Sequence, residues 1–102
     1  MDKLYPYFIL ILHPTYFNMG FFNINVDNER YIGEDNEFIE IHNENMNEVI
    51  IGKINRSVNR NNTPRIMGGS KLKKWFNENS HIMGKIKVEI LNKNRIFLKI
   101  IH

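Results

Sequence analysis

The sequence predicts a mainly β protein in which about seven strands and one clear helix form a small β-barrel. Short segments of alternating apolar and polar residues recur along the chain, and a period of two is typical of strands with one buried face. Turn-forming Gly, Asn and Pro residues separate these segments. With 102 residues, 42% of them hydrophobic, residues 1–102 are expected to form one domain around a single modest core.

The first half of the chain predicts four strands. They are expected at residues 7–12, 21–26, 38–42 and 49–54. The first is a continuous apolar run, which indicates a strand buried on both faces or at the centre of a barrel, and residues 14–20 after it predict a turn. In the second, Phe22, Ile24 and Val26 alternate with asparagines, so one face is expected to be buried. Residues 27–32 predict a single helical turn.

The second half predicts a short strand, a helix and a terminal hairpin. Residues 64–67 can re-enter the sheet. A helix is predicted over residues 70–77, with Ser70 as its N-cap, because three apolar residues have the spacing of one helical face. These are Leu72, Trp75 and Phe76. Residues 85–100 alternate regularly around a turn at 92–94, which predicts a β-hairpin with one buried face.

Charge is divided unevenly along the chain. Residues 1–50 hold nine acids and two bases, a net charge of −7, whereas residues 51–102 hold twelve bases and two acids, a net charge of +10. Seven of the bases follow one another with no acid between them, which is the pattern expected of a protein that binds a polyanion. They are Lys53, Arg56, Arg60, Arg65, Lys71, Lys73 and Lys74. The acids are expected to keep another face soluble and turned away from nucleic acid.

A polar segment at residues 55–65 is the main candidate for a binding surface. It contains three arginines, four asparagines, a serine and a threonine and no acid, so it is expected to be displayed at the surface. Arg and Asn side chains match the edges of guanine and adenine in the DNA major groove, and Arg, Ser and Thr suit phosphate oxygens. The segment therefore favours a DNA-binding arm; composition alone leaves a solvated hairpin loop as the alternative.

The order of elements resembles the B3-type pseudobarrel DNA-recognition domain, known from plant transcription factors and from effector domains of some bacterial restriction endonucleases. Residues 12–17 stand where plant B3 domains have Leu-x-x-Ser-Asp-Val, with Thr15 in place of the serine and Tyr16 in place of the aspartate. The family's later pattern, an aromatic-bearing helix followed by Leu-x-x-Gly-Asp, corresponds to residues 72–76 and to Ile82-Met83-Gly84-Lys85. The resemblance implies a small open seven-stranded β-barrel, or pseudobarrel, with one or two short helices.

The resemblance also implies sequence-specific binding of double-stranded DNA through two arms that grip the major groove. The first arm would be residues 13–19, and the second coincides with the polar segment. Candidates in the first arm are His13, Thr15, Tyr16 and Asn18. Candidates in the second arm are Asn55, Arg56, Ser57, Asn59, Arg60, Asn61, Asn62, Thr63 and Arg65. Non-specific attraction would come from Lys53, Lys71, Lys73 and Lys74.

No catalytic, metal or cofactor site is expected. The Glu-x-Lys nuclease pattern is absent, and the four histidines lack the spacing of a metal site. No phosphate-binding loop or Ser-His-Asp arrangement is recognisable. The lack of cysteine fits a reducing, cytoplasmic location. The apolar run at residues 4–12 is too short to span a bilayer and has no cleavage site after it, so no membrane association is expected.

Several partners and roles stay open at this point. A recognition domain without a nuclease would work with a nuclease or other partner subunit of a restriction or defence system, or would regulate transcription by occupying its site. A homodimer through residues 4–11 is compatible with either role. One rival interpretation is a module that stacks RNA or single-stranded bases on exposed aromatics. Another is a non-enzymatic interaction or inhibitor subunit from a mobile element or phage, docking through its acidic face at residues 34–48.

Overall fold

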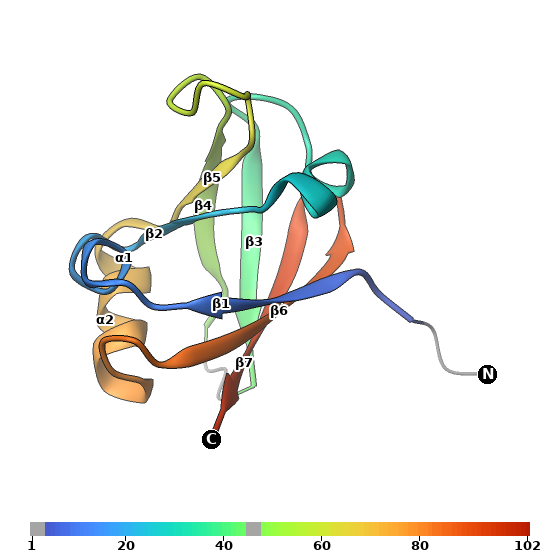
Figure 1. Ribbon diagram of the computed structural model, residues 1–102. Coiled ribbons are helices and arrows are strands. Elements are labelled where there is room, and N and C mark those ends of the chain that lie inside the picture. The colour runs from blue at the N-terminus through green and yellow to red at the C-terminus, as the bar shows by residue number, and fades with distance from the viewer. Residues whose placement is uncertain (1–3, 45–47) are drawn as a thin grey trace.

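A computed structural model describes residues 4–44 and 48–102 and has a mainly β architecture (Figure 1). Seven strands of the described chain form one sheet in the order β1-β6-β7-β3-β4-β5-β2. They are β1 (Tyr7–Ile11), β2 (Phe21–Asn23), β3 (Phe38–Asn43), β4 (Ile50–Asn55), β5 (Arg65–Met67), β6 (Lys85–Asn92) and β7 (Arg95–Ile101). Neighbouring strands are antiparallel except β3 and β7, which are parallel. The sheet curls into an open half-barrel, which confirms the predicted pseudobarrel.

Three short helical segments accompany the sheet. They are α1 (Pro14–Met19), the 3₁₀ segment η1 (Val26–Tyr31) and α2 (Gly69–Asn79). The prediction of a turn at residues 14–20 was wrong, because α1 occupies this segment. Pro14 suits the first helical position, and Gly20 ends the helix in the left-handed region at a φ of 73°. A helix of six residues is too short to show a periodic apolar pattern, so α1 could not be predicted from its residues.

The C-terminal end of α1 is hydrogen-bonded to the N-terminal end of α2. The carbonyl of Gly20 accepts hydrogen bonds from the backbone N–H groups of Gly68 and Gly69, at 3.0 and 3.1 Å. Asn77 Nδ2 also donates to the carbonyl of Phe17, at 3.4 Å. Figure 1 shows the two helices together on the left side of the barrel. The first arm is therefore held against α2.

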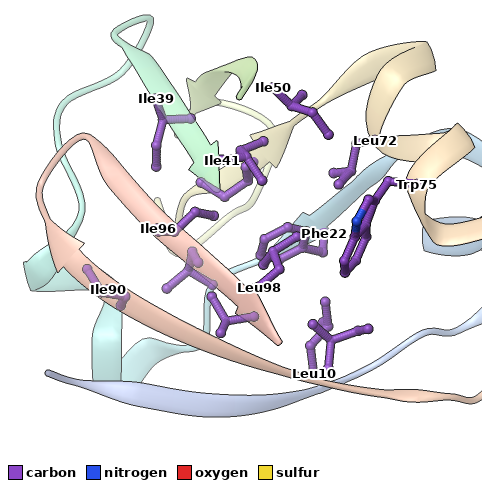
Figure 2. Close-up of a cluster of buried hydrophobic side chains, with 14 of the residues drawn as sticks. Leu10, Phe22, Ile39, Ile41, Ile50, Leu72, Trp75, Ile90, Ile96 and Leu98 are labelled. Carbon is purple, nitrogen blue, oxygen red and sulfur yellow. The ribbon is translucent and has the colours of Figure 1, made fainter. Parts of the chain in front are cut away.

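The core consists of alternate side chains of the sheet and one face of α2 (Figure 2). Its completely buried members include Leu12, Phe22, Ile41, Ile54, Ile66, Leu72, Phe76, Ile86, Val88, Ile96 and Leu98. Each such side chain contributes about 1.5–3 kcal/mol by leaving water. Trp75 is only 8% exposed, which confirms its predicted place in the core. The terminal hairpin β6–β7 is also as predicted, with its alternate residues buried.

Three local predictions were wrong. The first strand was expected to be buried on both faces or at the centre of a barrel, but β1 is an edge strand with only its inner face buried: Leu10 is buried, whereas Tyr7 and Ile9 on the outer face are exposed. Val26 was expected to be buried, but β2 ends at Asn23, and Val26 begins η1 at the surface. Ser70 lies inside the first turn of α2 and is not the cap, since the helix already begins at Gly69. The sequence also predicts a turn at residues 43–47, and this turn falls partly outside the described residues.

Candidate nucleic-acid interface

The two predicted arms are connected by a pair of strands. The first arm contains α1 and leads directly into β2, and the second arm leads directly into β5. Strands β2 and β5 are antiparallel, with Phe21 opposite Met67 and Asn23 opposite Arg65. In Figure 1, α1 lies at the left of the barrel and the loop between β4 and β5 lies at its top, with β5 running from this loop toward β2 and the helices. The outer face of β2 and β5 therefore lies between the two arms.

A continuous row of polar and aromatic side chains crosses this face. The ring of Tyr16 lies edge-on to the rings of His13 and Phe21, with centroids 5.9 and 5.6 Å away. The guanidinium carbon of Arg65 lies 4.3 Å from the centre of the Phe21 ring. Asn23 Oδ1 accepts hydrogen bonds from Arg65 Nε and from Asn59 Nδ2, both at 3.1 Å. We refer to these residues as the bridging row: His13, Tyr16, Phe21, Arg65, Asn23 and Asn59.

Arg65 lies in the middle of the bridging row with part of its hydrogen-bonding capacity unused. Its Nε is bonded to Asn23, and its planar group is stacked on Phe21. Within the described residues its two terminal nitrogens make no hydrogen bond, and the side chain is partly exposed. The contacts thus hold the guanidinium in one orientation while leaving the paired donors that suit a planar acceptor.

Arg56 has a structural role instead of the predicted contact with a base or phosphate. Its side chain is only 17% exposed. The guanidinium donates five hydrogen bonds of 2.8–3.1 Å, to Glu29 Oε2 and to the carbonyls of Glu29, Ile32, Gly33 and Asn62. Five is the full donor capacity of an arginine side chain. The group therefore has no donor left for a base and instead ties the second arm to η1 and the turn after it.

Most of the asparagines in the second arm shape the loop itself. Asn55 Oδ1 accepts from the backbone N–H groups of Ser57 and Val58 and from the Ser57 hydroxyl, at 3.0–3.2 Å. Asn61 Oδ1 accepts from the N–H and hydroxyl of Thr63. Such local bonds are typical of Asx turns. Thr63, for which a phosphate contact was predicted, is only 7% exposed, and its hydroxyl is already bonded to Asn61.

The remaining candidates lie at the surface. In the second arm these are Ser57, Arg60, Asn61 and Asn62, and in the first arm His13, Thr15 and Asn18. Arg60 makes no ion pair within the described residues. Asn62 has a φ of 61° and donates its backbone N–H to the carbonyl of Asn59, which closes a turn at the tip of the loop.

The four predicted lysines are exposed, three of them on α2 and one on β4. On α2, Lys71 pairs with Glu48 at 3.5 Å and Lys74 with Glu78 at 3.8 Å, and Lys73 has no ion pair within the described residues. Exposed pairs of this kind stabilise by about 0–1 kcal/mol, so these lysines keep most of their freedom to attract an anion. Lys53 lies on the outer face of β4, with its ammonium group 5.9 Å from the centre of the Phe38 ring.

Acidic side chains border the second arm on the side away from the bridging row. Glu29 is bonded to the Arg56 side chain, and Asp35 Oδ1 accepts from the Arg56 backbone N–H at 2.7 Å. Glu34 and Glu37 belong to the same turn, where Glu37 Oε1 accepts from the Glu34 N–H. A polyanion is therefore repelled from one side of the second arm and can approach it from the side of β2.

The bridging row includes two residues that were not among the predicted contacts with duplex DNA, Phe21 and Asn23. Their alternation with the buried Phe22 already indicated outward-facing positions. What the sequence lacked was the pairing of β2 with β5, which brings Asn23 beside Arg65 across 42 positions of the chain. Within the described residues there is neither a cluster of side chains that could hold a metal ion nor a helix long and apolar enough to cross a bilayer.

Comparison with known proteins shows similarity in fold. No family model matches the chain, and no curated protein is significantly similar to it. The N-terminal domain of Helicobacter pylori LlaJI.R1 superposes with a TM-score of 0.67 at 13% identity, over 94% of this chain and 79% of that one. The hypothetical Arabidopsis thaliana protein At1g16640.1 also gives a TM-score of 0.67, at 8% identity, over 96% of this chain and 91% of that one. These likenesses support a B3-type pseudobarrel fold.

Proposed function

We propose that this B3-like domain binds double-stranded DNA in a sequence-specific manner, with the major groove held between the first and second arms. The observation that carries the proposal is the bridging row, which connects the arms across the outer face of β2 and β5 and holds Arg65 at its middle. The net charge of +10 on residues 51–102 supports a polyanionic partner. The acids beside the second arm favour one direction of approach.

Arg65 is the residue we assign to base recognition. Its terminal nitrogens form a planar pair of donors, which matches O6 and N7 of guanine in the major groove. The stack on Phe21 and the bond to Asn23 fix the group before DNA arrives, which lowers the entropy lost on binding. Arg60, Lys73 and the exposed polar residues of the first arm are assigned to the phosphate backbone. These contacts supply affinity and position the protein without sequence preference.

Duplex DNA fits the surface better than single-stranded nucleic acid. A stacking platform needs an aromatic face that is open to solvent. Tyr16, Phe17 and Phe97 are each partly covered, and the face of Phe21 is occupied by Arg65. We infer that the domain acts by binding alone, as the recognition component of a restriction or defence system or as a regulator of transcription.

The proposal is tested by selecting binding sites from a randomised duplex library over a series of salt concentrations. We expect enrichment of a short motif and an affinity that falls linearly with log salt concentration. Arg65→Ala should relax the preference at one position and weaken binding by about 1–3 kcal/mol. Arg30→Ala, which removes an exposed arginine from η1 away from the bridging row, is the matched control and should leave the motif unchanged. Retention without any enriched motif would refute sequence-specific recognition.

A further inference from the structure

The outer face of β3 and β4 carries two strongly exposed apolar side chains. Phe38 is 69% exposed and Ile51 is 59% exposed, the two highest values among apolar side chains in the described strands. Large apolar side chains on neighbouring strands of an outer face mark an interaction surface more often than isolated ones do. Both residues lie outside the bridging row.

Two opposite charges complete a regular arrangement around this pair. In the antiparallel register of β3 and β4, Phe38 is opposite Lys53 and Glu40 is opposite Ile51. All four side chains are on the outer face, since their sequence neighbours Ile39, Gly52 and Ile54 are buried. The four form a square, here called the β3–β4 square, with the apolar residues on one diagonal and the charged residues on the other.

The β3–β4 square is complementary to a second copy of itself. When one copy is rotated by a two-fold axis along the apolar diagonal, Phe38 faces Phe38 and Ile51 faces Ile51. The same rotation places each Lys53 over the Glu40 of the other copy, so two ion pairs form. An isologous contact requires a surface of this self-complementary kind. A square with two like charges on its second diagonal would not have this property.

The two charged residues of the β3–β4 square, Glu40 and Lys53, are available for such a contact. Glu40 Oε1 accepts hydrogen bonds from His42 Nε2 at 2.9 Å and from Arg95 Nε at 3.0 Å, and both bonds lower the pKa of the Glu40 carboxyl. Both bonds use Oε1, which leaves Oε2 for a further donor. Lys53 has no ion pair within the described residues.

We propose that two copies of this chain form a two-fold symmetric dimer by packing their β3–β4 squares against each other. The apolar diagonal supplies the desolvated centre, and the Lys53–Glu40 pairs fix the orientation. Stable interfaces bury about 800 Å² per partner, and a contact centred on four side chains is smaller. The dimer is therefore weak and concentration-dependent. In this arrangement Lys53 serves the dimer and not the DNA contact predicted for it from sequence.

The proposal is tested by exchanging the charges of Lys53 and Glu40 and measuring self-association by sedimentation equilibrium in the absence of DNA. The wild-type chain should dimerise with a Kd in the micromolar range. Lys53→Glu alone and Glu40→Lys alone should each weaken self-association by at least about tenfold, because like charges then face each other. An equimolar mixture of these two variants should form a heterodimer, because it contains both ion pairs, one as in the wild type and the other with its two charges exchanged. Lys99→Glu, on the outer face of β7, is the control and should dimerise like the wild type.

Two results would overturn the dimer: a wild-type chain that stays monomeric up to millimolar concentration, or a mixture that associates no better than its components. Because Glu40→Lys also removes the bonds to His42 and Arg95, circular dichroism must first show that it is folded. Ile51→Ser gives an independent measurement, since it alters one exposed side chain and should raise the dimer Kd at least about tenfold. An unchanged Kd for Ile51→Ser would contradict the proposed interface. Because these measurements use no DNA, their failure leaves the proposed function unaffected.

Discussion

Replacing Arg56 with alanine is predicted to destabilise the fold strongly. The change removes five hydrogen bonds from the guanidinium, leaves four backbone carbonyls without this donor and breaks the pair with Glu29. Hydrogen bonds to a charged group contribute about 1.5–3 kcal/mol each, but such values do not add within one network. Water can reach part of the site, because Arg56 is 17% and Glu29 42% exposed. We therefore expect a loss of about 3 kcal/mol, at the lower end of the range for a broken buried pair.

The loss is measured by urea unfolding at neutral pH and by thermal unfolding. For a chain of this size about 3 kcal/mol corresponds to a fall in Tm of roughly 15 °C. Arg56→Lys should recover less than half of the loss, since an ammonium group has three donors and cannot copy the planar fork. Arg60→Ala, in the same loop but exposed, should change the free energy of unfolding by less than about 0.5 kcal/mol. A loss below about 1 kcal/mol for Arg56→Ala would refute the structural role and return Arg56 to the candidates for DNA contact.

Three further predictions concern separate parts of the molecule. Asn23→Ala should weaken binding to the selected DNA motif less than Arg65→Ala does, because it frees the guanidinium without removing it; equal losses in fluorescence anisotropy titrations would show that Asn23 itself contacts DNA. Gly20→Ala should lower the free energy of unfolding by about 2 kcal/mol or more, because φ is +73° and a Cβ there would lie 2.2 Å from the carbonyl oxygen of Gly69. Gly69→Ala is the matched control: its φ is +68° with nothing within 4 Å of the added atom, so urea unfolding should show only about 1 kcal/mol. The pKa of the Glu40 carboxyl is lowered from its ordinary value of 4.5, first by the hydrogen bond from His42 and then by the bond from Arg95. The ionised carboxylate therefore stabilises the folded state above pH 4.5, and this contribution is lost as the pH falls through the lowered pKa. Glu40→Gln should abolish this part of the difference in urea midpoint between pH 6 and pH 3, and an unchanged difference would show that the bonds do not affect stability.

Local patterns predicted the terminal hairpin and α2 well. In both elements the apolar residues recur at the period of the structure they form, and the segments are long enough to show several repeats. Helix α1 could not be found in this way, because it has six residues and none of them is buried. The parallel pairing of β3 with β7 could not be predicted from local patterns either, since it joins Glu40 to Arg95 across 55 positions of the chain.

The candidate interface was predictable in location but not in detail. Composition identified the second arm, because a polar segment without acids stands out between apolar runs. It could not separate Arg56 from Arg60 and Arg65, since all three have the same chemistry. The difference lies in the neighbours of Arg56. Residues 23–27 positions away accept from four of its five donors and Asn62 accepts from the fifth, whereas the donors of Arg65 are partly free.

The second arm contains two groups of residues that should respond differently to substitution. Arg56 at one end and Thr63 at the other are committed to the fold through buried contacts. Between them, Ser57, Arg60 and Asn62 are exposed. Asn62 is restricted by its φ of 61°, whereas the side chains of Ser57 and Arg60 can be changed while the ends of the loop keep the chain folded. Libraries randomised at Ser57 and Arg60 should therefore yield folded proteins at high frequency, and if the proposed function holds, these proteins will differ in the DNA that they bind.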